Sequence, residues 1–141
     1  MEKVILKRNS YSITINEEKC LFKININSID PYNEEGLVEF LTYFKNTWLF
    51  LKDGDKKYKL YAEFESKGYE HDIPLIAYTK IAITMLEINK TLEDKMTSVC
   101  IFSDNTEQWN SGFKIITAFW DKNKTPILLT DSKETVNEFL K

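Results

Sequence analysis

The sequence contains few of the residues that make linkers, metal sites and disulfides. It has four glycines, three prolines, two cysteines and one histidine in 141 residues. So few glycines and prolines predict no linker, repeat or low-complexity segment, and the length suits a single domain over residues 1–141. Cys20 and Cys100 lie far apart and lack metal-binding spacing, so we expect two free thiols and no metal or other cofactor.

Arginine is almost missing, because Arg8 is the only one. The formal net charge is −3, and charges of both signs are interspersed along the chain. Nucleic-acid binding normally needs a basic surface and paired arginine contacts, so the composition argues against it. No apolar run is long enough for a transmembrane segment, and the first residues hold too short a run for a signal peptide. We expect a soluble, cytoplasmic protein.

Two hydrophobic periods alternate along the sequence. Period-two alternation in the first thirty residues (KVILK, YSITIN and CLFKINI) predicts an N-terminal β-hairpin, or a three-stranded meander if the first segment joins it. Helical spacing then predicts helices at about 34–50, 73–90, 106–121 and 132–140. Alternating or short apolar segments between them predict strands at 57–66, 98–102 and 126–130. This order predicts an α/β fold with one mixed sheet, whose later strands are parallel and joined by right-handed crossovers. The charges in 57–66 predict that one face of that strand is only partly covered.

A polar cluster, FSDNTEQW, joins the strand at 98–102 to the next helix. Asp104 and Glu107 have the spacing of a capping box, which predicts a structural role at the helix start. Ligands of α/β proteins also bind near the carboxyl ends of parallel strands. The candidate binding residues at this junction are therefore Ser103, Asp104, Asn105 and Trp109. No glycine separates the strand from the helix, which argues against a dinucleotide or P-loop site.

A second candidate region, KGYEHDIP, follows the strand at 57–66. Its candidate contact residues are Tyr69, His71 and Asp72, and Asp72 is also placed to cap the next helix. Sequence neighbours point in different directions and the chain has no second histidine, so we expect no metal site here. A small hydrolase that uses His71 as a base with a residue of the 103–105 turn is a further hypothesis, although no serine has a nucleophile-elbow pattern.

Bulky side chains recur at helical spacing in the third predicted helix. The members of this stripe are Trp109, Phe113, Ile116 and Trp120. Such a stripe is more typical of a core than of a ligand pocket. Because Phe119 and Trp120 are adjacent, one of them should point away from the stripe and toward an interaction surface.

The element order, and above all the C-terminal half, resembles STAS domains and the SpoIIAA-like relatives of CRAL-TRIO domains. The residues that carry the resemblance are an apolar strand (Val99 to Phe102), a turn with Asp104, an amphipathic helix (Trp109 to Trp120), a short strand (Ile127 to Leu129) and an acidic start to a last helix (Asp131 to Leu140). STAS antagonists of anti-sigma factors carry a phosphorylated serine where the second helix begins, but this chain has Asp72 and no serine there.

The resemblance implies one of two binding functions. STAS-like proteins favour protein contacts, here through the regions around 66–75 and 103–109. CRAL-TRIO-like proteins favour a lipid or other apolar ligand, held between the second and third helices and the sheet. The bulky stripe fills the space that such a ligand needs, so we expect first a non-enzymatic regulatory or interaction module that binds a protein partner or itself. Apolar-ligand binding is the alternative, and catalysis ranks third.

Overall fold

One mixed sheet organises the whole chain in the computed structural model, which describes residues 1–141, with side chains for 1–91 and 94–141. Its strands, in spatial order, are β1 (Glu2–Lys7), β2 (Tyr11–Asn16), β3 (Leu21–Asn27), β4 (Tyr58–Glu65), β5 (Met96–Ser103) and β6 (Ile127–Thr130). The helices are α1 (Glu34–Lys52), α2 (Leu75–Leu92), α3 (Thr106–Phe119) and α4 (Lys133–Leu140), with a 3-10 turn η1 (Glu93–Lys95). β1 to β3 form an antiparallel meander and β3 to β6 are parallel, which confirms the predicted α/β mixed sheet.

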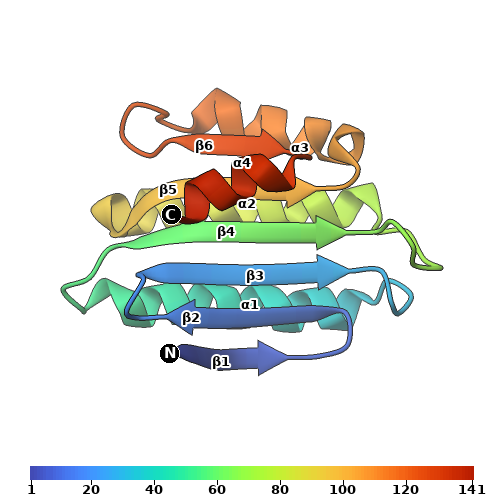
Figure 1. The fold of residues 1–141 in the computed structure, drawn as a ribbon, viewed down its shortest axis with the longest axis horizontal. Coiled ribbons are helices and arrows are strands. Elements are labelled where there is room, and N and C mark those ends of the chain that lie inside the picture. The colour runs from blue at the N-terminus through green and yellow to red at the C-terminus, as the bar shows by residue number, and fades with distance from the viewer.

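The helices form two unequal layers (Figure 1). From β3 onward each strand lies beside the one before it in sequence, and right-handed crossovers that advance in one direction place their helices on one face. α1, α2 and α3 therefore share one face of the sheet. α4 follows the last strand and lies against the other face, in front of β5 in this view. The carboxyl ends of β3 to β6 all reach the same edge of the sheet.

The main core lies between the sheet and the layer of α1, α2 and α3. On the α1 side, Trp48 stacks on Phe22 with ring centroids 4.6 Å apart. On the α2 side, Trp109 packs edge-on against Phe64 and Tyr78, with centroids 4.6 and 4.9 Å away. Gly112 lets α3 approach α2 closely, since a Cβ there would lie 3.3 Å from the Tyr78 carbonyl oxygen.

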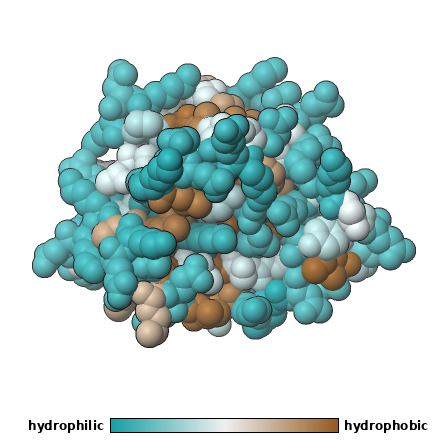
Figure 2. Space-filling view, in the orientation of Figure 1, coloured by the Kyte–Doolittle hydropathy of each residue, from teal (hydrophilic) through white to brown (hydrophobic). Residues whose placement is uncertain are grey.

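A smaller core lies under α4. Val136 is buried there against Tyr61, Cys100 and Phe102. α4 thus covers the outer face of β4 more completely than its charges predicted, and even Glu63 is buried. The remaining surface on this side is mostly hydrophilic, with small separate hydrophobic areas (Figure 2).

The element boundaries follow local chemistry. α1 begins where predicted, and the side-chain oxygen of Asn33 accepts a hydrogen bond from the Gly36 amide at 3.1 Å. α2 begins at Leu75 and not at residue 73, because a residue that precedes proline, here Ile73, is disfavoured in helical geometry. In α3 the adjacent pair separates as predicted, with Trp120 buried and Phe119 68% exposed.

Candidate functional site

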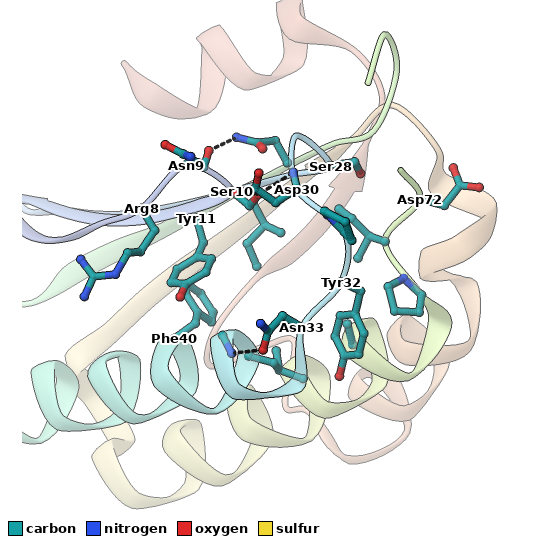
Figure 3. A pocket seen from close by; sticks show the side chains of 18 of the residues that line it. Arg8, Asn9, Ser10, Tyr11, Ser28, Asp30, Tyr32, Asn33, Phe40 and Asp72 are labelled. Atoms are coloured by element: carbon teal, nitrogen blue, oxygen red, sulfur yellow. Dashed lines mark hydrogen bonds between the residues drawn. The ribbon is translucent and has the colours of Figure 1, made fainter. Parts of the chain in front are cut away.

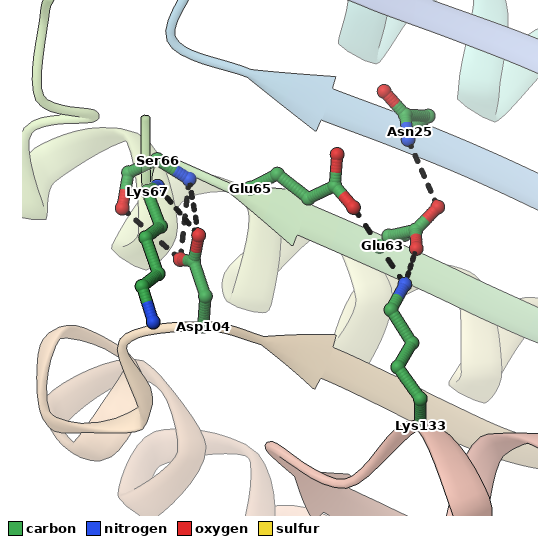
Figure 4. Close-up of polar contacts among 7 residues, drawn as sticks. All are labelled: Asn25, Glu63, Glu65, Ser66, Lys67, Asp104 and Lys133. Carbon is green, nitrogen blue, oxygen red and sulfur yellow. Dashed lines mark hydrogen bonds and ion pairs between the residues drawn. The ribbon is translucent and has the colours of Figure 1, made fainter. Parts of the chain in front are cut away.

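The two regions singled out in the sequence meet at the carboxyl edge of the sheet, where Asp104 joins them (Figure 4). Its carboxylate accepts hydrogen bonds from the Ser66 amide at 2.9 Å, from the Ser66 hydroxyl at 3.1 Å and from the Lys67 amide. The predicted capping box is therefore wrong. Asn105 is the N-cap residue of α3 and makes no side-chain cap hydrogen bond, while Asp104 fixes the loop that follows β4.

Replacing Asp104 with alanine should lower the free energy of unfolding by about 1.5 kcal/mol, because it leaves two backbone amides of the β4–α2 loop without their acceptor. Urea denaturation measures this loss. Asp104→Asn keeps one carbonyl oxygen and should lose less. Equal stability of Asp104→Ala and the parent protein would contradict the structural role of this carboxylate.

Two of the predicted contact residues do not reach the surface. Ser103 and Trp109 are both 0% exposed. The Ser103 hydroxyl accepts a hydrogen bond from the Asn105 amide at 3.1 Å, and the indole of Trp109 fills the space between α2, α3 and the sheet. Both are internal packing residues in this structure, so neither side chain is placed to contact a partner at the surface. The ligand space expected between these helices and the sheet is filled.

The other predicted residues lie on the β4–α2 loop. Tyr69 and Asp72 are exposed and His71 is half-buried. None of the hydrogen bonds among the described side chains connects His71 with the 103–105 turn. Asp72 does not cap α2, because the helix begins three residues later, after Pro74. It lies instead at a pocket that the sequence did not reveal.

This pocket has a volume of about 740 Å³ and opens at the carboxyl edge of the sheet (Figure 3). Three loops surround it: the β1–β2 turn, the β3–α1 loop and the segment that leads into α2. The volume is within the range of small-molecule sites. The position matches the rule that ligands of open α/β sheets bind beyond the carboxyl ends of the strands.

The floor of the pocket is apolar and partly aromatic. Its buried aliphatic and aromatic side chains include Leu37, Phe40 and Ile81. The Tyr11 ring forms part of one wall and lies on Gly36, where an added Cβ would be 3.3 Å from the ring. Glycine at this place in the first turn of α1 therefore gives the ring its room.

A charged triad fixes the same wall. The Arg8 guanidinium contacts both carboxylate oxygens of Glu39, at 3.1 and 3.3 Å, and the Tyr11 hydroxyl donates to Glu39 at 2.8 Å. The hydrogen bond from Tyr11, together with Arg8, lowers the pKa of Glu39. Burial and this hydrogen bond raise the pKa of Tyr11. Tyr11 is therefore a protonated donor at neutral pH and not a general base.

Ser28 gives the pocket an unusual polar group. It lines the pocket, is 2% exposed, and its hydroxyl has no hydrogen-bond partner among the described residues. Buried hydroxyls almost always have a partner, since leaving one unpaired costs about 1–3 kcal/mol. The neighbouring polar groups do have partners, unlike the Ser28 hydroxyl. Ser10 and Asp30 are joined by two hydrogen bonds of 3.0 and 3.3 Å.

Cys100 and the possible metal ligands are the remaining reactive groups of the described part of the chain. Burial raises the pKa of Cys100 to about 11, so its thiol is a poor nucleophile at neutral pH. No group of three or more His, Cys, Asp or Glu side chains among the described residues is placed to hold a metal ion. Each helix in the described part of the chain is too short or too polar to span a bilayer.

The pocket residues missed in the sequence had one detectable signal. Polar turn residues follow β1 (Arg8, Asn9 and Ser10) and β3 (Ser28 and Asp30), just as they follow β4 and β5. The carboxyl-edge rule that selects candidates after β4 and β5 also selects Ser28, Asp30 and Tyr32 when it is extended to β3.

Comparison with known protein families, curated proteins and solved structures finds no match for this chain. The resemblance to STAS and SpoIIAA-like domains stays a prediction from the sequence.

Proposed function

We propose that this protein is a non-enzymatic binding module that takes a small amphipathic ligand in the pocket between the β1–β2 turn, the β3–α1 loop and the start of α2. The proposal reverses the order expected from the sequence, where a protein partner ranked before an apolar ligand. It also moves the ligand away from the space between α2 and α3, which Trp109 fills.

One observation carries the proposal: a pocket of about 740 Å³ combines an apolar floor with the buried, unpartnered hydroxyl of Ser28. Pockets of this kind bind ligands through apolar area and gain orientation from a few polar groups. An apolar ligand body would contact Leu37, Phe40 and Ile81. A rotation of the Ser28 side chain about χ1 would bring its buried hydroxyl to a polar atom of the ligand.

A protein partner is the second candidate, and the rim of the pocket favours it. Large apolar side chains are exposed around this edge, namely Ile29, Tyr32, Leu75 and Ile76. Clustered exposed apolar residues mark interaction sites. A partner that binds here would cover the pocket, so both candidates use the same edge of the sheet.

We expect 3-phenylpropan-1-ol, an apolar body with an uncharged polar end, to bind in the pocket. In a titration followed by ¹H–¹⁵N NMR, amide shifts should change around Ser10, Ser28 and Ala77 and stay constant around Phe119, which lies on the outer surface of α3. Shift changes confined to residues outside the pocket would contradict the proposal.

Two buried serines provide a matched pair of variants. Ser28→Ala removes the unpartnered hydroxyl and should weaken binding of the alcohol about fivefold while leaving the free energy of unfolding equal or higher. Ser103→Ala removes a buried hydroxyl that has a partner outside the pocket, so it should cost about 1 kcal/mol of stability and leave binding unchanged. Equal effects of the two variants on binding would count against a role of Ser28 in the site.

A further inference from the structure

We infer that the ligand carries a cationic group, an ammonium or a substituted amine, which lies between the carboxylates and the aromatic rings at the mouth of the pocket. This inference rests on the proposed function, since it assigns the charge of the ligand for the same site.

Two positive side chains, Lys7 and Arg8, belong to residues that line the pocket. Each guanidinium nitrogen of Arg8 has a contact within the chain, because Nη1 donates to the Lys7 carbonyl oxygen at 3.0 Å while Nε and Nη2 contact Glu39. Lys7 pairs with Ser12 next to the buried pair Leu6 and Ile13. Since side chains alternate along a strand, the Lys7 ammonium projects to the opposite face of the sheet. An anionic ligand in the pocket would therefore compete with Glu39 for Arg8, and the Lys7 ammonium lies on the other face of the sheet.

The negative side chains of the pocket are not neutralised by ion pairs. Asp30 and Asp72 both line the pocket. None of the ion pairs among the described residues involves either carboxylate. Asp30 accepts one hydrogen bond, from the Ser10 hydroxyl, which leaves acceptor capacity toward the pocket. An acidic mouth attracts cations and repels anions.

Aromatic rings add a second preference for a cation. The labelled side chains in the close-up include Tyr11 and Phe40 on one side of the pocket and Tyr32 on the other, with Asp30 above them (Figure 3). The face of an aromatic ring attracts an organic cation through the negative charge density of the ring. A positively charged group with an apolar stem thus matches both the rings and the carboxylates.

The N-termini of α1 and α2 also face this edge and would favour an anion, but acidic groups offset them. Glu34 and Glu35 occupy the first turn of α1, and Asn33 takes up the Gly36 amide. Asp72 precedes α2 and carries the charge that this helix lacks in its first turn. The partial charge at the N-terminus of α1 is therefore compensated within the chain.

The test compares three probes with one apolar body: 3-phenylpropylamine, 3-phenylpropan-1-ol and 3-phenylpropanoate, each titrated into the full chain by NMR at low ionic strength. We expect the amine to bind about fivefold more tightly than the alcohol, and the carboxylate more weakly than either. Added salt should reduce the advantage of the amine and leave the alcohol unaffected.

Two variants locate the effect. Asp30→Asn keeps the oxygen that accepts from Ser10, and it should reduce the preference for the amine over the alcohol to about twofold or less. Asp55→Asn removes an exposed carboxylate just before β4, at the opposite edge of the sheet, and should keep the full preference. Equal binding of amine and alcohol, or tighter binding of the carboxylate, would overturn the inference while the proposed function stands. Binding of none of the three probes would overturn the proposed function itself.

Discussion

Replacing Trp109 with alanine is expected to lower the free energy of unfolding by about 4 kcal/mol, the largest loss that we predict for a single side chain. Trp109 is 0% exposed and packs against Phe64 and Tyr78. The indole N–H makes no hydrogen bond within the described residues, so the cost comes from lost packing and not from a lost polar contact. Chemical denaturation of the purified variant measures it.

Two controls make this prediction specific. Trp109→Phe keeps an aromatic body and should cost markedly less. Phe119→Ala, on the same helix but 68% exposed, should change stability by no more than about 0.5 kcal/mol. A loss below 1 kcal/mol in Trp109→Ala, or a loss equal to that of Phe119→Ala, would contradict the assignment of Trp109 to the core.

The same variant distinguishes a core from a hidden ligand site. Trp109→Ala opens a space between α2, α3 and the sheet, and apolar cavities of this kind bind small aromatic molecules. Indole should therefore raise the melting temperature of Trp109→Ala and leave that of the parent chain unchanged. Stabilisation of the parent chain with shift changes around Gly112 would instead support a ligand space at this position, as the CRAL-TRIO-like resemblance implied.

The fold followed from the sequence because each element is set by local periodicity. The alternation of Ile13 and Ile15 with polar residues determined β2, and the helical spacing of Phe40, Phe44 and Trp48 determined α1. The start of α2 was misplaced by two residues because the effect of Pro74 on the preceding residue outweighed the hydrophobic pattern.

The candidate site followed from the sequence only in part, because it depends on contacts between distant segments. Asp104 has the spacing of a capping residue, but its carboxylate bonds the backbone at Ser66 and Lys67, 38 and 37 positions away. The pocket combines three loops that only the sheet order brings together, with Ser28 and Asp72 as members from two of them. The spacing of residues along the chain does not predict contacts between such distant segments.

The packing of α4 on the outer face of the sheet was likewise not predicted from the sequence. The charges of β4 predicted exposure, but Lys133 of α4 forms an ion pair with Glu63, and its ammonium lies 3.6 Å from Glu65 (Figure 4). The Asn25 amide adds a hydrogen bond of 3.1 Å to Glu63. A charge that would face solvent on an open strand is thus paired beneath a helix.

Replacing Lys133 with methionine should lower the free energy of unfolding by about 2 kcal/mol at neutral pH, because it leaves the Glu63 carboxylate buried without its cation. The Glu63 side chain is 12% exposed, whereas that of Lys133 is 55% exposed, so the loss stays below that of a fully buried pair. Methionine keeps a stem that can pack on Phe102, whose ring centroid lies 4.0 Å from the Lys133 ammonium. Urea denaturation with circular dichroism provides the measurement.

The loss should depend on pH in a defined direction. Burial alone raises the pKa of Glu63, but the hydrogen bond and charge of Lys133, with the Asn25 amide, bring it below the ordinary value. A carboxylate with a lowered pKa stabilises the fold above the pKa of the unfolded chain, and this contribution disappears as the pH falls through the folded pKa. Without Lys133, burial raises the pKa of Glu63. Protonation of Glu63 at low pH then removes the cost of burying an unpaired carboxylate in the variant. The difference between the two proteins should shrink as the pH falls from 7 to about 3.

Glu65 changes the free energy of unfolding with pH in the opposite direction to Glu63, so the two contributions must be measured separately. Burial and the charge of Glu63 raise the pKa of Glu65, so its ionisation costs stability as the pH rises. Glu65→Gln in both backgrounds removes this contribution and should leave the effect of Lys133→Met in place. Lys141→Met, which breaks the exposed contact with Glu138 in the same helix, should have almost no effect at any pH. If the loss in Lys133→Met were constant between pH 7 and about 3, Lys133 would act through the contact of its ammonium with the Phe102 ring and not as the cation that keeps Glu63 ionised beneath α4.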